Sequence, residues 1–190
     1  MEIREVALDA GVKEPLAQLL ACCFPCYRDE GATEAEKLLA GDRLALAAFE
    51  SGEMLGFVGA IPQYNPSVKA GKVWATGWEL HPLAVFPAYR GKGVGAALVA
   101  RLEKILAGRG ASLLYLGCDD ERGQTSLSNT NLYADTFEKI LDIRNLKRHP
   151  YSFYEKQGYR IVGVLPDANG PGKPDIWMAK AIGMKEESQI

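Results

Sequence analysis

The stretch YRGKGVG, at residues 89–95, decides the fold because it joins the apolar segment 83–86 to a helical pattern that begins at Val94. Its three glycines lack the side chains that would keep a ligand away from the backbone. The first turn of the following helix presents unpaired N–H groups and the positive end of the helix dipole. Arg90 and Lys92 add positive charge. The stretch therefore predicts a loop, between a strand and a helix, that binds a phosphate group.

Two other phosphate-binding loops contain similar glycines, and the sequence fits neither. A Walker loop, G-x-x-x-x-G-K-[ST], needs a glycine where Phe86 stands and a Ser or Thr after Lys92, and both are missing. The dinucleotide fingerprint is G-x-G-x-x-G on the first strand of a parallel domain, whereas this chain has G-x-G-x-G near its middle and no acidic residue at the ribose-binding distance. A glycine-rich turn that binds nothing is the plainer alternative.

Length and composition set the outer limits. The 190 residues, 47% of them hydrophobic, carry a formal net charge of −2 and indicate one α/β domain with an ample core. We expect this domain to span residues 1–182 and a disordered tail to occupy residues 183–190. No stretch approaches the roughly 18 to 20 apolar residues of a membrane span, and the N-terminus MEIREVAL lacks a signal-peptide pattern. A cytoplasmic protein without a membrane partner is therefore expected.

The mild acidity and the cysteines exclude further classes of partner. A net charge of −2 argues against nucleic-acid binding and suits a small cationic substrate. The cysteines include one C-x-x-C, but no second pair and no suitably spaced histidines accompany it. They are Cys22, Cys23, Cys26 and Cys118. We expect reduced thiols and no metal, with a metal site as the weaker alternative.

The apolar pattern predicts strands that alternate with helices. The expected strands are residues 3–8, 44–49, 54–63, 73–86, 112–118, 159–165 and 176–180. The expected helices are residues 15–23, 33–40, 94–108, 132–146 and 150–158, with loops at 27–31 and 65–71. Pro82 lies inside the long strand 73–86, and because proline cannot donate to a strand ladder, we expect the pairing to weaken or bulge there.

The order strand, RGKGVG loop, helix, strand, and then a helix containing FYEKQGY at residues 153–159 resembles the GCN5-related N-acetyltransferase (GNAT) superfamily. This resemblance implies a single α/β GNAT domain whose mixed, strongly twisted sheet has about seven strands and helices on both faces. It also implies acetyl-coenzyme A as the cosubstrate, with its pyrophosphate on the glycine loop and its pantetheine along the preceding strand. The residues implied for coenzyme binding are Leu83, Ala84, Val85, Arg90, Gly91, Lys92, Gly93, Val94 and Gly95.

Several segments resemble the aminoglycoside 6'-N-acetyltransferases of the chromosomal enterococcal type. They are FVGAIPQY (57–64), GWELHPLAV (77–85), LYLGCDD (114–120), NLKRHPYSFYEKQGY (145–159) and VGVLPDANGPGKPDIWMAK (162–180). This closer resemblance implies an N-acetyltransferase that moves the acetyl group directly to a primary amine in a ternary complex. It also implies a homodimer, for which the helix near residues 132–146 and the last strand could supply an apolar interface.

The same resemblance assigns roles to individual residues. Glu79 would hold and deprotonate the acceptor amine, and Tyr154 would lie beside the departing thiolate. His81 and Leu83 would lie beside the thioester, and Tyr64 would contact the substrate. These are roles implied by the resemblance.

Elementary chemistry independently requires a carboxylate. An alkyl ammonium with a pKa near 10.4 is almost wholly protonated at pH 7, which costs about 4 to 5 kcal/mol before the amine can attack a thioester. If the strand alternates, Glu79 points to the same side as His81 and Leu83 and can take that proton. A thiol leaving group with a pKa near 8.5 leaves a deficit of only about 2 kcal/mol, so Tyr154 should matter less.

Each of these residues also has a structural alternative. Glu79 could lie on a solvated face, but its apolar neighbours Trp78 and Leu80 favour function. His81 could equally be a hydrogen-bonded wall residue. Tyr154, taken without the motif, would be a packing tyrosine.

The substrate residues are less determined. The acidic residues at the end of an apolar strand, Asp119, Asp120 and Glu121, form either an ordinary solvated turn or an anionic wall that binds a polyamine sugar near Glu79. Two departures from the enterococcal type concern the acceptor: residues 26–28 are Cys, Tyr and Arg in place of acidic residues, and segment 65–75 is longer. An added arginine repels a polycation.

Three functions follow from the sequence. The first is an aminoglycoside 6'-N-acetyltransferase, and hence antibiotic resistance. The second is an N-acetyltransferase for another amine, such as a polyamine, a small metabolite or a protein lysine. The third is a non-catalytic module that binds acetyl-coenzyme A, against which the presence of both Glu79 and Tyr154 argues.

Overall fold

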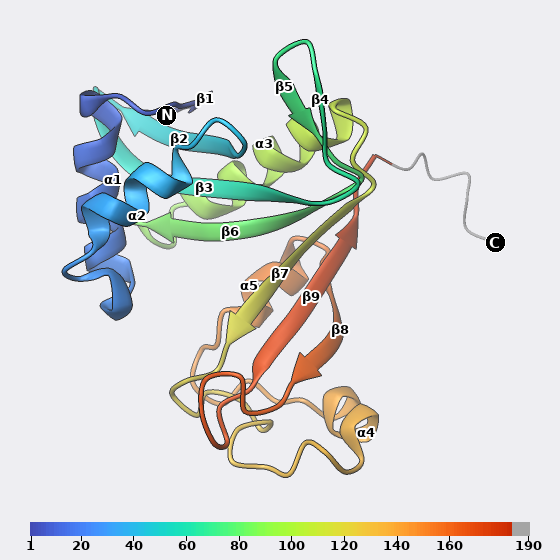
Figure 1. Cartoon of the computed structure of the whole chain (residues 1–190). Coiled ribbons are helices and arrows are strands. Elements are labelled where there is room, and N and C mark those ends of the chain that lie inside the picture. Colours follow the sequence, from blue (N-terminus) through green and yellow to red (C-terminus); the bar gives the residue numbers. More distant parts are fainter. Residues whose placement is uncertain (184–190) are drawn as a thin grey trace. The chain divides into compact units, whose positions relative to one another are not determined.

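Most of the predicted strands and helices are confirmed in a computed structural model of the chain, which describes residues 1–183 (Figure 1). The predicted disordered tail, residues 183–190, lies outside the described residues except for Gly183. The chain divides into two compact units. The first comprises residues 1–114 and 181–183, and the second comprises residues 115–180.

The first unit contains four strands in the order β1-β2-β3-β6, each antiparallel to its neighbour. They are β1 (Glu2–Glu5), β2 (Leu44–Glu50), β3 (Glu53–Tyr64) and β6 (Gly77–Val85). All residues of β2 except Glu50 are buried, because this strand is covered on both faces. The apolar run LALAAF therefore forms the centre of the unit.

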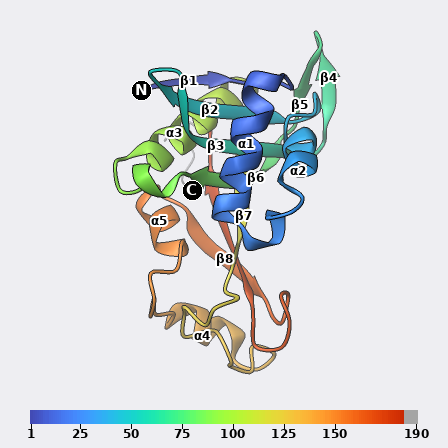
Figure 2. The ribbon, with the colours of Figure 1, turned by 90° about the vertical axis from the view of Figure 1, so that its left-hand side faces the viewer.

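Helices cover both faces of these strands (Figure 2). They are α1 (Ala10–Cys23), α2 (Gly31–Leu38) and α3 (Val94–Gly108), with the short 3-10 helices η1 (Pro25–Tyr27) and η2 (Pro87–Tyr89). Phe57 on β3 packs in one core cluster with Leu16 and Leu38 of α1 and α2. A Cβ atom on the adjacent Gly56 would instead lie 3.3 Å from Leu98 of α3. Because successive strand residues face opposite sides, α3 covers the face opposite to α1 and α2.

Helix α1 begins at Ala10 and not near Pro15 as predicted. Asp9 caps it, because its Oδ1 accepts hydrogen bonds from the N–H groups of Gly11 (2.7 Å) and Val12 (3.2 Å). Pro15 lies inside the helix, where it has no N–H to donate to the preceding turn. The aspartate cap was thus a stronger signal than the proline.

The strand predicted for residues 73–86 is interrupted. Its first part is β5 (Lys72–Trp74), which pairs with β4 (Ser67–Lys69) in a separate hairpin, so the predicted loop 65–71 contains a strand. The turn residues Ala70 and Gly71 have φ angles of 49° and 73°, which is the conformation of a two-residue hairpin turn. Because the chain turns back at Ala70 and Gly71, residues 72–74 pair with β4. The strand that pairs with β3 is therefore limited to β6 (Gly77–Val85).

The second unit contains three strands in the order β7-β9-β8. They are β7 (Leu113–Asp119), β9 (Asp175–Ala181) and β8 (Arg160–Leu165). Together with the four strands of the first unit, these three strands match the number of about seven predicted from the sequence. β8 and β9 are antiparallel, with an irregularity between Ile161 and Gly163.

The helices of the second unit are α4 (Thr136–Leu141) and α5 (Tyr151–Lys156). The helix predicted for residues 132–146 is therefore much shorter. Asn131 Oδ1 accepts from the N–H of Tyr133 (3.1 Å), Asp135 has a φ of 51°, and the N–H of Arg144 donates to Ser126 Oγ (2.9 Å). These local bonds replace helical ones at both ends. Within residues 1–183, no helix has both the length and the apolar character needed to cross a membrane.

Candidate active site

The candidate catalytic residues of the first unit share one face of β6. Glu79, His81 and Leu83 are partly exposed, whereas the residues between them are buried. The predicted alternation along this strand is therefore confirmed. It directs Glu79 away from the core and toward the same side as His81.

The strand is irregular at Pro82, as predicted. Val58 of β3 pairs with Leu83 and Ala60 pairs with Leu80, so His81 and Pro82 together face Gly59. A Cβ atom on Gly59 would lie 2.5 Å from the carbonyl oxygen of His81, so only glycine admits this approach. The His81–Pro82 peptide bond is cis. The bulge interrupts the ladder beside the residues predicted to contact the thioester.

Glu79 has one hydrogen-bond partner from the neighbouring strand. Gln63 Nε2 donates to Glu79 Oε2 at 2.9 Å. A second register shift, between Pro62 and Tyr64, lies beside Gln63, and the half-exposed Tyr64 packs so closely that a Cβ atom on Gly77 would lie 2.5 Å from its ring. The structure thus brings Glu79 and Tyr64 together at one end of β3 and β6. Gln63 was not predicted from the sequence, because its contact with Glu79 depends on strand register.

The predicted phosphate loop has a backbone that only glycine adopts easily. Gly91 and Gly93 have φ angles of 75° and 85°. A Cβ atom at either position would meet nothing within 4 Å, so the loop is open in front of both residues. Gly93 caps α3 without a side-chain hydrogen bond, and the first turn of α3 contains no acidic residue. The N-terminus of this helix therefore fits an anion such as the pyrophosphate of coenzyme A.

Side chains of the loop hold it to β6, β3 and α1. Arg90 Nε donates to the carbonyl oxygen of Val85 (3.0 Å), and Arg90 Nη2 donates to Cys23 Sγ (3.2 Å). The Tyr89 hydroxyl donates to Glu53 Oε2 (3.3 Å), and Lys92 Nζ lies 5.3 Å from the centre of the Tyr89 ring. The negative charge of Glu53 raises the pKa of the Tyr89 hydroxyl.

In the second unit, Tyr154 is a buried residue of α5. Its ring packs edge-on against Phe153, with centroids 5.0 Å apart, and against Tyr159, with centroids 5.7 Å apart. Burial raises the pKa of the Tyr154 hydroxyl, and the Cys118 thiol, when ionised, raises it further. Burial likewise raises the pKa of Cys118. Tyr154 is therefore a neutral hydrogen-bond donor throughout the physiological range.

The two adjacent aspartates differ sharply. Asp120 is fully buried, and it accepts hydrogen bonds from the N–H groups of Gln124 (2.6 Å) and Thr125 (2.7 Å) and from Ser128 Oγ (2.7 Å). Burial alone would raise the pKa of Asp120, but these hydrogen bonds outweigh it and lower the pKa. Asp119 is exposed, and its Oδ1 accepts from Asn169 Nδ2 at 2.6 Å.

A buried histidine holds the end of β7. His149 Nε2 lies 3.1 Å from the carbonyl oxygen of Asp119, and burial lowers the pKa of this imidazole. Asn145 Oδ1 accepts from the N–H of His149 (2.7 Å), and Asn145 Nδ2 donates to Ser152 Oγ (2.8 Å). Neither residue was predicted from the sequence. The only local signal was a His-Pro pair before a helix.

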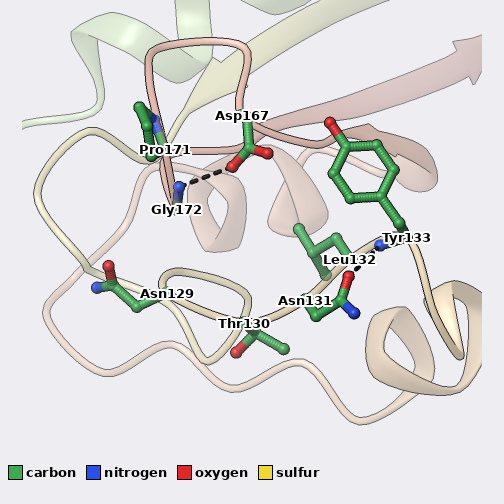
Figure 3. Close-up of a pocket in the computed structure, with 8 residues that line it drawn as sticks. All are labelled: Asn129, Thr130, Asn131, Leu132, Tyr133, Asp167, Pro171 and Gly172. Carbon is green, nitrogen blue, oxygen red and sulfur yellow. Dashed lines mark hydrogen bonds between the residues drawn. The ribbon is translucent and has the colours of Figure 1, made fainter.

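A further pocket of about 350 Å³ lies in the second unit (Figure 3). It lies between segment 129–133 and the turn that contains Asp167 and Gly172. The N–H of Gly172 donates to Asp167 Oδ1 (2.7 Å), and the charge of Asp167 raises the pKa of Tyr133. None of the predicted site residues lines this pocket. Among residues 1–183, no group of His, Cys, Asp and Glu side chains is arranged to hold a metal ion.

Comparison with known proteins identifies the family. The model of the acetyltransferase (GNAT) family matches residues 13–134. An aminoglycoside 6'-N-acetyltransferase crystallised with coenzyme A is 47% identical over 98% of this chain and 100% of its own, with a TM-score of 0.90. The enzyme of this name from Enterococcus faecium gives 47% identity, the same coverage and a TM-score of 0.88.

An aminoglycoside 6'-acetyltransferase of type Ii is 41% identical over 97% of this chain and 99% of its own, with a TM-score of 0.75. Among curated proteins, none matches significantly. The predicted fold class, the N-acetyltransferase activity and acetyl-coenzyme A as cosubstrate are confirmed. On its sequence, its fold and its coenzyme loop, the chain belongs to the acetyltransferase (GNAT) family.

Proposed function

We propose that this chain transfers the acetyl group of acetyl-coenzyme A to the 6'-amine of aminoglycosides, by direct transfer in a ternary complex. The observation that carries this proposal is the high identity, over nearly the whole chain, to enzymes of that name. The pairing of Glu79 with Gln63 on the open face of β6 supports it. If the proposal is right, expression of the protein makes a bacterium resistant to these antibiotics.

Glu79 is the proposed base. The acceptor ammonium must lose a proton, at a cost of about 4 to 5 kcal/mol at pH 7, before its nitrogen can attack the thioester carbon. Gln63 Nε2 donates to Oε2 of Glu79, and Oε1 is the proposed acceptor of the proton from the ammonium. Tyr64, at the same end of the strands, supplies a half-exposed ring and hydroxyl for the sugar.

The leaving group needs one proton. As the nitrogen–carbon bond forms and the carbon–sulfur bond breaks, the sulfur of coenzyme A leaves as a thiolate that accepts a hydrogen bond and then takes its proton from solvent. Tyr154 is the proposed donor, because burial keeps its hydroxyl protonated. His81 and Leu83 lie beside the bulge of β6 and are the proposed neighbours of the thioester. A backbone N–H near Leu83 would polarise the thioester carbonyl.

Coenzyme A is proposed to lie along the end of β6 and on the glycine loop. The residues are Leu83, Ala84, Val85, Arg90, Gly91, Lys92, Gly93, Val94 and Gly95. The open backbone at Gly91 and Gly93 supports this assignment. Loop N–H groups would bind the pyrophosphate, and Lys92 would add charge.

Of the two aspartates, Asp119 is the better candidate for substrate contact. Its carboxylate is exposed and has one oxygen bonded to Asn169. The three hydrogen bonds to Asp120 favour a structural role for that residue, which organises segment 124–128. Asp120 would then act on the substrate only by holding the chain next to Asp119.

A second candidate is an N-acetyltransferase for another amine. The hairpin of β4 and β5 carries exposed Lys69 and Lys72, and Arg28 follows η1; these cations would repel a polycation in the first unit. Release of coenzyme A thiol should be compared for kanamycin, spermidine, and a lysine peptide. We expect kcat/KM for kanamycin to exceed the others by about 100-fold or more. Equal values would remove aminoglycosides as the substrate class.

We further propose a homodimer of single-domain chains, residues 1–182, that acts in the cytoplasm. The second unit exposes large apolar side chains on α4, β8 and β9. They are Phe137, Leu141, Val162, Leu165 and Trp177. Such a set of exposed apolar residues is typical of an interface. Gel filtration with light scattering should give twice the mass of 20.7 kDa, and Leu141→Glu should give monomers.

A further inference from the structure

Cys23 ends helix α1 and reaches the coenzyme loop. Its half-buried Sγ lies 3.5 Å from the carbonyl oxygen of Val85, the last residue of β6. The same sulfur lies 3.2 Å from Arg90 Nη2. The neighbouring Cys22 is exposed. Only one of the two adjacent thiols therefore points toward the loop.

Arg90 contacts both Cys23 and Val85, so the three residues are joined pairwise by hydrogen bonds. Its Nε donates to the same carbonyl oxygen of Val85 at 3.0 Å, and its backbone N–H donates to Pro87 at 3.3 Å. The guanidinium is thus turned back over the end of β6. Because Gly91 follows directly, with a φ of 75°, the position of Arg90 fixes where the open part of the loop begins.

The protonation state of Cys23 suits this geometry. Burial raises the pKa of the thiol more than the Arg90 guanidinium lowers it, so the thiol is neutral at pH 7. A neutral thiol can donate to Val85 and accept from Arg90 at the same time. A thiolate would lose the bond to Val85.

We propose that Cys23 is a positioning residue for coenzyme binding. It holds the Arg90 side chain on the end of β6 and thereby fixes the glycine loop in the conformation that receives the pyrophosphate. This inference rests on the proposed coenzyme site. It adds a role for α1, which contributes no residue to the predicted site.

The test is the affinity for coenzyme A, measured by calorimetry without any amine. Cys23→Ala removes the acceptor, Cys23→Ser keeps a donor and acceptor, and Cys22→Ala is the matched control on the same helix. We expect Cys23→Ala and Arg90→Ala each to weaken binding about 3- to 10-fold. Cys23→Ser and Cys22→Ala should stay within about twofold of the parent.

The double variant Cys23→Ala/Arg90→Ala should bind coenzyme A no more weakly than Arg90→Ala alone, because both single changes break the same contact between Cys23 and Arg90. KM for acetyl-coenzyme A should rise with the dissociation constant, and KM for the amine should not change. The role of Cys23 would be overturned if the double variant lost affinity for coenzyme A by the product of the two single losses. It would also be overturned if Cys23→Ala bound coenzyme A as tightly as the parent, or if Cys22→Ala lost as much affinity as Cys23→Ala. A parent that does not bind coenzyme A would instead overturn the coenzyme site itself, and a parent that binds it but acetylates no aminoglycoside would overturn only the proposed function.

Discussion

The two units hold their candidate site residues in opposite ways. In the first unit, Glu79 is partly exposed and the glycine loop is open, with most of its geometry set by the backbone. In the second unit, Tyr154 and Asp120 are buried, and Asp120 is bonded to three donors from its own loop. We infer that replacing Glu79 removes activity and leaves stability intact, whereas replacing the buried, hydrogen-bonded Asp120 lowers stability.

The largest effect is expected for Glu79→Gln. Without the carboxylate nothing takes the proton from the acceptor ammonium, so kcat/KM for kanamycin should fall by about 100-fold or more. The melting temperature should change by less than about 2 °C, because Glu79 is partly exposed. Steady-state kinetics and calorimetry measure the two. Glu50→Gln, an exposed change on β2, should be neutral. Full activity of Glu79→Gln would contradict its role as the base.

Asp120→Ala tests the second unit. It leaves the N–H groups of Gln124 and Thr125 and the hydroxyl of Ser128 without their acceptor, so the free energy of unfolding should fall by about 2 to 3 kcal/mol. Urea denaturation measures this. Asp119→Ala, on the exposed neighbour, should cost less than about 0.5 kcal/mol. An equal cost for both would remove the distinction between these aspartates.

The same carboxylate predicts a pH dependence. The pKa of Asp120 in the folded protein lies below its value near 3.9 in the unfolded chain. Its contribution to the free energy of unfolding is therefore present above about pH 4 and is lost as the pH falls through the folded pKa. The difference in unfolding free energy between the parent and Asp120→Ala should therefore narrow below about pH 4. A difference that stays constant between pH 7 and pH 3 would contradict this.

The glycine loop could be predicted from the sequence, and the role of Asp120 could not, for one physical reason. The backbone at Gly91 and Gly93 is a local property, since positive φ angles exclude most other residues. The burial of Asp120 depends on how residues 124–128 fold back over it. The pair Asp119-Asp120 gives no hint that one residue is inside and the other outside.

The same difference between local and long-range interactions explains which helices and strands were predicted correctly. Helix α3 was predicted correctly because its apolar spacing is local and strong. The helix expected over residues 132–146 failed, because Asn131 and Ser126 bond to the backbone where helical bonds would be. Gln63 and His149 were missed because strand register and a distant carbonyl decide what they contact.

Tyr154→Phe should have a smaller effect than Glu79→Gln. It removes only the hydroxyl that serves a leaving group with a deficit of about 2 kcal/mol, so kcat should fall by about 10-fold and KM should stay constant. The ring packing against Phe153 and Tyr159 is kept, so Tm should change little. Tyr151→Phe, on the same helix, is the control. A change in kcat below twofold would leave Tyr154 a packing residue.

The smallest effect is expected for Gly93→Ala. This variant tests whether coenzyme binding requires the positive φ angle of Gly93 or only the absence of a side chain there. A Cβ atom at Gly93 meets nothing within 4 Å, so the change causes no clash, but its φ of 85° costs an alanine about 1 kcal/mol. If the loop relaxes to avoid this cost, coenzyme A binding should weaken about fivefold. Gly108→Ala, at the other end of α3, also meets nothing within 4 Å but lies in the helix, so it should leave binding unchanged and slightly stabilise the protein. Equal binding by both variants would mean that the positive φ of Gly93 is not what the coenzyme requires.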